Sequence, residues 1–272
     1  MFEMEVRSLG NRTDLIFQRF EGEVLDRGDY LVLLTPSNPT YRWGNMLLFS
    51  DPPEEGDFER WHRLFAREVG AGPSIDHVVF AWDTVNGETG HVRPFLDAGF
   101  ELDESVVLSA SAVNPPPKIN PEVRIERLQT QSEWQEALEL QVLCRDEEED
   151  ESSYRPFMER RMEQYQRMVA AGKGSWFGAY LNEMLVADLG LFVEDGVGRF
   201  QNVETHPDYR RQGICGTVVH EVSRYGLEAM GAETLVMIAD CNYHAAGIYE
   251  SVGFVQVERL VGMERDQAPS RK

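Results

Sequence analysis

The residues best suited to chemistry lie in one short stretch of the sequence, 203–216, where a β-rich run ends and a helix is predicted to begin. The first turn of a helix has unpaired N–H groups and the positive end of the helix dipole, so it attracts phosphate. Arg210 and Arg211 add positive charge before the helix, while Gly213 and Gly216 allow the backbone to approach a phosphate closely. The stretch therefore predicts a phosphate-binding loop.

The glycine pattern alone does not distinguish between known kinds of phosphate site. The loop lacks the Gly-Lys-Ser/Thr of a P-loop and the full Gly-x-Gly-x-x-Gly of a dinucleotide site. An ordinary loop followed by a glycine-capped helix fits the same residues. Both interpretations stay open on this stretch by itself.

The overall charge argues against one large class of partner. The chain of 272 residues has 26 Lys and Arg against 47 Asp and Glu, which is a net charge of −21. Non-specific binding to nucleic acid requires basic residues that displace counterions from phosphates. We therefore expect no nucleic-acid partner.

The sequence also predicts where the protein works. It has no apolar run of the roughly 20 residues needed to span a bilayer, and its first residues do not resemble a secretory signal. Its three cysteines are widely spaced and form no metal-binding pair. We expect a cytoplasmic protein with no membrane partner and no metal.

Three consecutive prolines at 115–117 mark the clearest boundary in the chain. Such a run cannot lie inside a helix or a central strand, and it stiffens a connector. We predict a first domain over 1–113, a Pro-rich linker over 114–119 and a second domain over 120–272.

The two predicted domains repeat one pattern. Each has an apolar strand that ends at an aspartate, followed by a helix and then a Gly-Phe pair. The aspartate and the pair are Asp83 and 99–100 in the first domain, and Asp240 and 253–254 in the second. Two matches in the same order indicate duplication of one strand–helix–strand unit. Chance similarity of such a unit is the alternative.

Hydrophobic periodicity predicts a mixture of helices and strands in both halves, and hence an α/β (α+β) fold. In the second half, a capping box at Ser132 is expected to open a helix. In the first half, Asp57 is expected to cap a helix whose inner face includes Trp61 and Phe65. The strands predicted in the second half are 122–128, 176–181, 185–193 and 200–205.

At 210–215 the loop reads Arg-Arg-Gln-Gly-Ile-Cys, which resembles the Arg/Gln-x-x-Gly-x-Gly/Ala signature of the GNAT superfamily of acetyl-CoA-dependent N-acetyltransferases. Cys215 departs from the signature, but it is small and Gly216 follows it. Further along, 242–254 resembles the Asn-x-x-Ala-x-x-x-Tyr-x-x-x-Gly-Phe run of the same family. The resemblance covers roughly 120–265 and reaches the first half only through the internal repeat.

The resemblance implies tandem GNAT-like domains, each a mixed and mostly antiparallel sheet flanked by helices, with a degenerate first copy. Val203 and Thr205 would hold the pantetheine arm of acetyl-CoA through their backbones. Asn242 opens the second family run and is assigned to the same acetyl-CoA site. The pyrophosphate would be bound by the loop residues Arg210, Arg211, Gln212, Gly213, Ile214, Cys215 and Gly216.

The resemblance also implies two catalytic residues. Tyr249 stands where a tyrosine commonly protonates the departing CoA thiolate, a task suited to a phenol with an ordinary pKa of about 10. A core aromatic is the alternative for Tyr249. Glu204 lies near the position where several family members place a general base, and an exposed strand residue is the alternative.

The implied activity is transfer of an acetyl group from acetyl-CoA to an amine of a small molecule or peptide, by direct attack in a ternary complex. The competing class is a non-catalytic acyl-CoA-binding or interaction module, and the protein is expected to be a monomer or homodimer. The acidic run 146–151 adds a cationic acceptor as a hypothesis, with a solvated segment as the alternative. The first copy has an acidic segment at 51–57, so it is predicted not to bind CoA.

Overall fold

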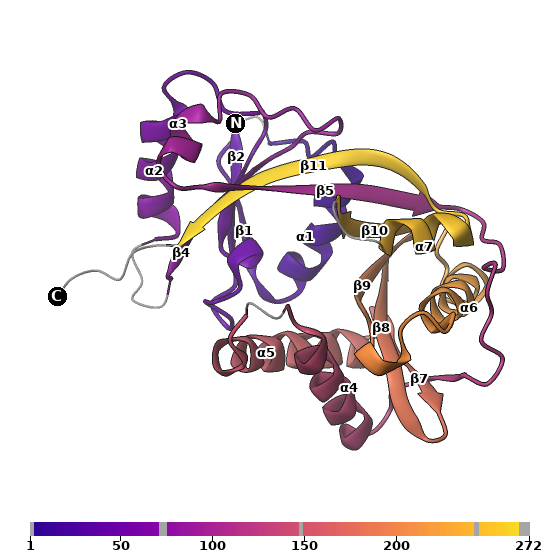
Figure 1. Ribbon diagram of the computed structural model, residues 1–272. Helices are drawn as coiled ribbons and strands as arrows, with labels where there is room; N and C mark the ends of the chain where they lie inside the picture. The colour runs from indigo at the N-terminus through magenta and orange to yellow at the C-terminus, as the bar shows by residue number, and fades with distance from the viewer. Residues whose placement is uncertain (1–2, 71–74, 147–148, 242–244, 267–272) are drawn as a thin grey trace. The chain divides into compact units, whose positions relative to one another are not determined.

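The computed structural model describes residues 3–70, 75–146, 149–241 and 245–266 (Figure 1). The chain divides into two compact units: one runs up to Val107 and resumes at Val257, and the other is Leu108–Gln256. The described ranges contain seven α-helices and eleven strands, and most neighbouring strands are antiparallel. The predicted α/β class is confirmed.

The first unit is built on the strand order β1-β2-β3-β4-β11-β5. The pair β3/β4 is parallel, whereas β1/β2, β2/β3 and β4/β11 are antiparallel. Its elements are α1 (Leu9–Glu21), β1 (Glu23–Asp26), β2 (Tyr30–Leu34), β3 (Met46–Phe49), α2 (Asp57–Glu68), β4 (His77–Trp82), α3 (Arg93–Asp97), most of β5 (Glu101–Ala110) and most of β11 (Val255–Asp266).

Helices cover both faces of the first unit's sheet. Phe80 of β4 lies in one apolar cluster with Trp61 and Phe65 of α2, which are the predicted inner face of that helix. Its neighbour Val79 lies in a second cluster with Leu15 of α1. Successive residues of a strand point to opposite faces, so β4 contributes to two cores.

The unit boundaries differ from the predicted domains. The last strand, expected in a second domain over 120–272, joins the first unit from Val257 onward. There β11 pairs with β4, with Met263 opposite Phe80. Backbone N–H and C=O groups are satisfied by whichever strand lies alongside them, so strand pairing rather than chain order decides where a terminal strand belongs.

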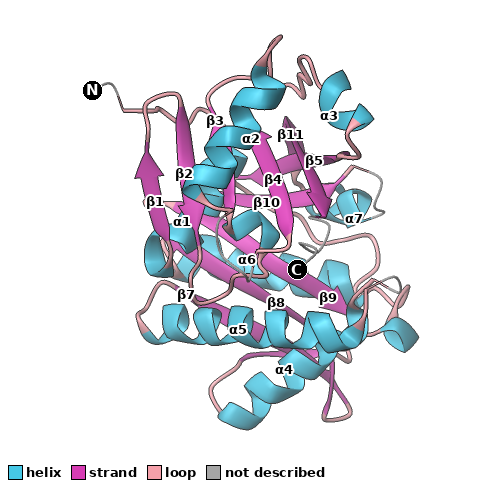
Figure 2. Cartoon of the chain, turned by 90° about the vertical axis from the view of Figure 1, so that its left-hand side faces the viewer, coloured by secondary structure: helices cyan, strands magenta, loops and turns pink. Residues whose placement is uncertain are grey.

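The second unit is built on the strand order β10-β9-β8-β7-β6, in which only β9/β10 is parallel among the described pairs. Figures 1 and 2 show α4 and α5 on one face of this sheet and α6 on the other. Its elements are β6 (Arg124–Arg127), α4 (Gln131–Cys144), α5 (Glu151–Ala170), β7 (Gly174–Leu181), β8 (Met184–Glu194), β9 (Val197–Thr205), α6 (Ile214–Ala229), β10 (Thr234–Asp240) and α7 (Ala245–Val252).

Helix α4 begins two residues earlier than predicted. The capping box forms between Thr130 and Glu133, not at Ser132. The Thr130 hydroxyl accepts the N–H of Glu133 at 3.3 Å, and the Glu133 carboxylate accepts the N–H of Thr130 at 2.8 Å. Two N–H groups are thereby satisfied together, which a cap at Ser132 with Gln135 does not achieve here.

The two Gly-Phe pairs adopt the same local geometry. Gly99 and Gly253 both have positive φ, +86° and +111°. In each copy the phenylalanine N–H donates to the carbonyl five residues earlier at 3.1 Å, and the phenylalanine itself is buried. This is the repetition that a duplicated strand–helix–strand unit predicts.

Candidate active site

The predicted functional residues gather where β9 and β10 separate. These parallel strands pair only at their beginnings, Thr234–Val236 opposite Val197–Arg199, and the described residues show no further pair between them. The rest of β9 therefore presents backbone N–H and C=O groups on that side. A cavity of about 690 Å³ lies beside the end of β9, within the second unit.

Three segments that the sequence analysis singled out meet at this cavity: the end of β9, the loop before α6, and α7. Ten of the twelve predicted site residues line it: Val203, Glu204, Thr205, Arg210, Arg211, Gly213, Ile214, Cys215, Gly216 and Tyr249. Their individual roles remain predictions.

A β-bulge shapes the end of β9. The register between β8 and β9 shifts between Asp188 and Gly190, and Asn202 has a left-handed φ of +48°. Gln141 of α4 donates to the Asn202 carbonyl at 3.0 Å and accepts from the Asn202 amide at 3.1 Å. The Gln141 side chain thus stabilises the left-handed conformation of Asn202, which sets the direction of the β9 residues that follow.

A buried carboxyl group anchors this arrangement. Asp188 is fully buried and lies opposite Glu204 in the β8/β9 register. It accepts from Gln141 Nε2 at 2.7 Å and from Trp176 Nε1 at 2.9 Å. Burial raises the pKa of Asp188 well above its ordinary value, and the charge of Glu204 raises it further. Asp188 is therefore an internal hydrogen-bond anchor.

Glu204 is a carboxyl group that can exchange protons near neutral pH. Burial, which penalises the charged form, raises the pKa of Glu204 to about 7. Arg210 and a hydrogen bond with Cys144 act in the opposite direction, while Asp146 raises the pKa. A pKa close to the working pH is what a general base needs.

The two cysteines near Glu204 are poor nucleophiles. Burial raises the pKa of Cys144 and of Cys215 to about 12, and the charge of Glu204 adds to both shifts. The thiolate is the reactive form of cysteine, so neither side chain is activated near neutral pH.

The loop before α6 has the backbone geometry of an anion site. A 3-10 turn at Pro207–Tyr209 leads to Arg211, whose φ is +62°, and Gly213 is the N-cap of α6 with φ +81°. The first turn of α6 contains no acidic residue. Arg210 turns back, because its Nε donates to the Thr205 carbonyl at 3.0 Å. Its guanidinium therefore lies against the end of β9.

The predicted linker 114–119 packs against this loop and belongs to the second unit. Lys118 Nζ donates to the Arg211 carbonyl at 2.7 Å, and Asn120 Nδ2 donates to the Gln212 carbonyl at 3.2 Å. At its other end, Asn114 donates its N–H to the last residue of α7 at 2.8 Å. These tertiary hydrogen bonds hold the segment against the loop, so it is not a free connector between two domains.

The loop glycines make room for that segment. A Cβ atom on Gly213 would lie 2.7 Å from the Lys118 carbonyl oxygen, and one on Gly216 would lie 3.1 Å from Pro116 Cβ. Close approach to a phosphate is the predicted reason for both glycines. The structure adds a second reason, which is the close approach of residues 116–118.

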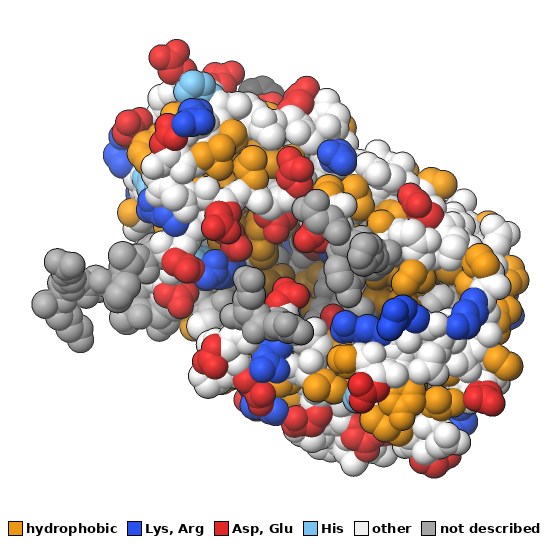
Figure 3. All heavy atoms as spheres, in the orientation of Figure 1, with side chains coloured by type: hydrophobic (Ala, Val, Ile, Leu, Met, Phe, Trp, Pro, Cys, Tyr) orange, Lys and Arg blue, Asp and Glu red, His pale blue; other side chains and the backbone are white. Residues whose placement is uncertain are grey.

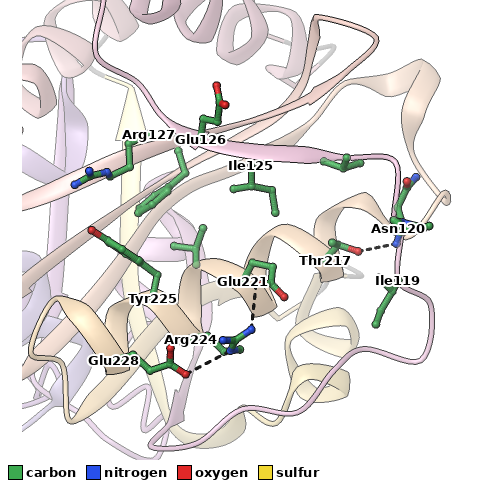
Figure 4. A pocket seen from close by; sticks show the side chains of 14 residues that line it. Ile119, Asn120, Ile125, Glu126, Arg127, Thr217, Glu221, Arg224, Tyr225 and Glu228 are labelled. Atoms are coloured by element: carbon green, nitrogen blue, oxygen red, sulfur yellow. Dashed lines mark hydrogen bonds and ion pairs between the residues drawn. The ribbon is translucent and has the colours of Figure 1, made fainter.

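A second cavity, of about 610 Å³, lies between β6 and α6 (Figure 4). Its charged rim is paired: Arg224 lies 3.4 Å from Glu221 and 3.5 Å from Glu228, and the Arg127 guanidinium lies 5.7 Å from the Tyr225 ring centre. It contains none of the predicted site residues. We therefore place the candidate active site at the cavity beside β9.

Residues 134–254, which span most of the second unit, match the family model described as the acetyltransferase (GNAT) family. This unit carries a GNAT-family domain. Such a domain supports acyl-CoA-dependent acetyl transfer in general. No curated protein sequence matches the chain significantly.

Solved structures of similar fold cover nearly the whole chain. A GCN5-related N-acetyltransferase from Kribbella flavida is 13% identical with a TM-score of 0.65, covering 95% of this chain and 96% of its own. A functionally unknown conserved protein from Staphylococcus epidermidis is 16% identical with a TM-score of 0.70, covering 92% and 96%. A tandem GNAT protein from the clavulanic acid biosynthesis pathway is 12% identical with a TM-score of 0.57, covering 100% and 92%. These likenesses support a GNAT fold with a second, N-terminal domain, as predicted.

Among the described residues, one predicted site residue of the GNAT domain does not line the cavity. Gln212 lies in the loop, but its side chain donates to the Asp208 carbonyl at 3.3 Å. Asn242 lies outside the described residues, as do Glu147 and Glu148 of the acidic run. Cavity residues that the sequence analysis did not select are Pro116, Pro117, Lys118, Tyr209, Gly247, Ile248 and Ser251.

Three of these seven additional residues carried a weak sequence signal. Gly247, Ile248 and Ser251 lie inside the family run at 242–254, so the run itself could have found them. Nothing near residues 116–118 indicated contact with a loop more than 90 positions away. Across the described ranges, no helix has the length and apolar character to cross a bilayer, and no group of three His, Cys, Asp or Glu side chains is placed to hold a metal.

Proposed function

We propose that the GNAT domain transfers an acetyl group from acetyl-CoA to an amine by direct attack within a ternary complex. The observation that carries this proposal is that Glu204, Tyr249 and the glycine-containing basic loop line one cavity. A proton acceptor, a proton donor and a phosphate-binding helix start are the parts that this reaction needs.

Acetyl-CoA would lie along β9 with its phosphates at the start of α6. The edge of β9 beyond Arg199 offers backbone groups to the pantetheine amides, and the predicted pair Val203 and Thr205 lies on it. The Thr205 carbonyl already accepts a hydrogen bond from Arg210 Nε. A pantetheine N–H that used the same carbonyl would either share it with Arg210 or replace that hydrogen bond. The diphosphate would accept hydrogen bonds from the N–H groups of 212–216.

The chemistry would proceed by three proton transfers around one bond exchange. Glu204 accepts one proton from the acceptor ammonium, and the free amine attacks the thioester carbonyl carbon. The C–S bond then breaks, and Tyr249 gives its proton to the CoA thiolate. The attacking nitrogen loses its second proton to the Tyr249 phenolate, which leaves a neutral amide and restores the phenol. Direct attack is favoured over an acyl-cysteine route because burial keeps Cys144 and Cys215 in the thiol form.

The carboxylates around Glu204 favour a cationic acceptor. Tyr154, at the start of α5, has its pKa raised by burial first and then by the charges of Glu149, Glu204 and Asp146. Those three carboxylates therefore make the electrostatic potential around Tyr154 more negative, and a positively charged amine would be attracted there. We propose a cationic amine, such as a polyamine or an aminoglycoside, as the acceptor class.

The activity is tested by following release of the CoA thiol from acetyl-CoA with a panel of polyamines, aminoglycosides, amino acids and peptides. We expect turnover with at least one cationic amine. Tight binding of acetyl-CoA without turnover on any amine would instead favour the non-catalytic acyl-CoA-binding module.

The acceptor class is tested by replacing two carboxylates, Asp146→Asn and Glu149→Gln, with Glu159→Gln as the matched control on the exposed surface of α5. We expect KM for the amine to rise several-fold in the double variant, and more so at low salt, where charges are less screened. KM for acetyl-CoA should not change. A KM for the amine equal to that of the control would contradict a cationic acceptor.

A further inference from the structure

The residues 114–120 place a positive charge in the acyl-CoA cavity from outside the family motifs. Figure 3 shows a short row of basic side chains across the face of the second unit that it presents. Lys118 lines the cavity together with Arg210 and Arg211. Arg210 is turned toward the end of β9, so the start of α6 has fewer free cations than the sequence indicates.

Lys118 is held beside the N–H groups that would bind the diphosphate. Its Nζ lies 2.7 Å from the carbonyl oxygen of Arg211, the residue directly before the segment 212–216. A lysine ammonium has three donors, and the Arg211 carbonyl uses one of them. The other two remain for a phosphate oxygen at the same loop.

The backbone around Lys118 is fixed in place. Asn120 donates its N–H to the Thr217 hydroxyl at 2.9 Å and its amide to the Gln212 carbonyl at 3.2 Å. On the other side, Pro116 is buried against Gly216. Because the segment is held on both sides of Lys118, its backbone loses little entropy when Lys118 binds a ligand.

We propose that Lys118 is a phosphate-binding residue of the acyl-CoA site and that residues 114–120 form the outer wall of that site. The proposal rests on the proposed function, because it assumes that acyl-CoA binds in this cavity. The ligand chemistry is a phosphate oxygen of CoA, either in the diphosphate or in the 3′-phosphate.

The test compares Lys118→Met, which keeps the length of the side chain but removes its charge, with Lys118→Arg, which keeps the charge. Lys173→Met is the matched control, because Lys173 is an exposed lysine of the same unit that does not line the cavity. Affinity for acetyl-CoA is measured by calorimetry at several salt concentrations, and thermal unfolding checks that each variant is folded.

We expect Lys118→Met to weaken acetyl-CoA binding by about fivefold to tenfold, the range for an exposed charge-assisted contact. The loss of affinity with added salt should be less steep than in the unaltered protein, because one ionic contact is missing. Lys118→Arg should retain most of the affinity and the original salt dependence, and Lys173→Met should retain both fully. A merely structural role of Lys118 would not alter the salt dependence.

Acetyl-dephospho-CoA, which lacks the 3′-phosphate, distinguishes the two sources of phosphate. If the effect of Lys118→Met disappears with this ligand, Lys118 contacts the 3′-phosphate; if it persists, Lys118 contacts the diphosphate. Unchanged affinity of Lys118→Met for acetyl-CoA, or weaker binding with an unchanged salt dependence, overturns the proposal. Failure of the unaltered protein to bind acetyl-CoA would instead overturn the proposed function.

Discussion

Helices α2 and α6 begin with the same backbone conformation but differ in the charge at their first turns. In the first unit α2 follows Gly56, with φ +91° and ψ −7°, and in the second unit α6 follows Gly213, with φ +81° and ψ 4°. The first turn of α2 contains Asp57 and Glu59, whereas the first turn of α6 contains no acidic residue. The two helix starts therefore share a backbone shape and differ in their electrostatics.

In α2 the first turn carries the protein's own carboxylates. The Asp57 carboxylate accepts the N–H of Glu54 at 2.8 Å and lies 3.1 Å from Arg60. A carboxylate at a helix N-terminus stabilises the helix, but it repels a diphosphate. We therefore expect that a left-handed glycine before a helix is insufficient for phosphate binding and that the charges beside it decide.

The surroundings of the two glycines also differ. A Cβ atom on Gly56 would meet nothing within 4 Å, whereas one on Gly213 would meet the Lys118 carbonyl oxygen at 2.7 Å. Gly56 is needed only for its φ angle. Gly213 is needed both for its φ angle and for the space that residues 116–118 occupy.

The largest expected effect is the loss of acetyl-CoA binding in Gly213→Glu. The new side chain displaces Lys118 and puts a negative charge beside the diphosphate, so affinity should fall by more than about 100-fold, the range for an unpaired like charge at a phosphate site. Gly56→Glu is the matched control and should bind acetyl-CoA like the unaltered protein. Calorimetry measures both. Near-normal affinity in Gly213→Glu would place the phosphate site elsewhere.

Glu204→Gln tests the proposed base at the end of β9. The strand before α2 in the first unit, β3, ends instead at the buried Phe49. A base acts in its deprotonated form, so kcat/KM of the unaltered protein should rise with pH and level off above about pH 7, the pKa of Glu204. The variant should lose this dependence, and its kcat should fall roughly 10²- to 10³-fold. A pH profile identical to that of the unaltered protein would exclude Glu204 as the base.

Tyr249→Phe is expected to have a somewhat smaller effect. The ring and its packing against Phe254 remain, so affinity for acetyl-CoA should stay near normal. Loss of the phenolic proton should lower kcat by roughly 10²-fold, the low end for general acid catalysis. Steady-state kinetics with pre-steady-state acetyl transfer measures the chemical step directly. Transfer at the normal rate in that measurement would assign Tyr249 to packing.

The smallest expected effect is on stability, in the pair Gly56→Ala and Gly213→Ala. Both place a side chain at positive φ, which costs about 1 kcal/mol. Gly213→Ala should cost roughly 1–2 kcal/mol more, because its Cβ atom also clashes with the Lys118 carbonyl, as overpacking of that size predicts. Denaturant unfolding measures both free energies. Equal losses would show that residues 116–118 move aside at no cost.

The sequence by itself determined the elements that depend on short stretches of chain. The strand at 200–205, the loop at 210–216 and the Gly-Phe turns were all predicted, and ten of the predicted site residues line one cavity. Periodicity, turn residues and helix starts act over a few neighbouring positions, which is why they can be read along the chain. The acidic segment before α2 likewise showed the difference between the two copies.

Tertiary structure decided what depends on residues far apart in sequence. The pKa of Glu204 is set by burial and by neighbours on α4 and in the loop, and the left-handed Asn202 is held by Gln141. The strand after Val257 joins the first unit by pairing with β4, and Lys118 reaches the loop before α6 through contacts that its own neighbours do not encode. Desolvation, strand pairing and docking all depend on which surfaces meet, so no local pattern specifies them.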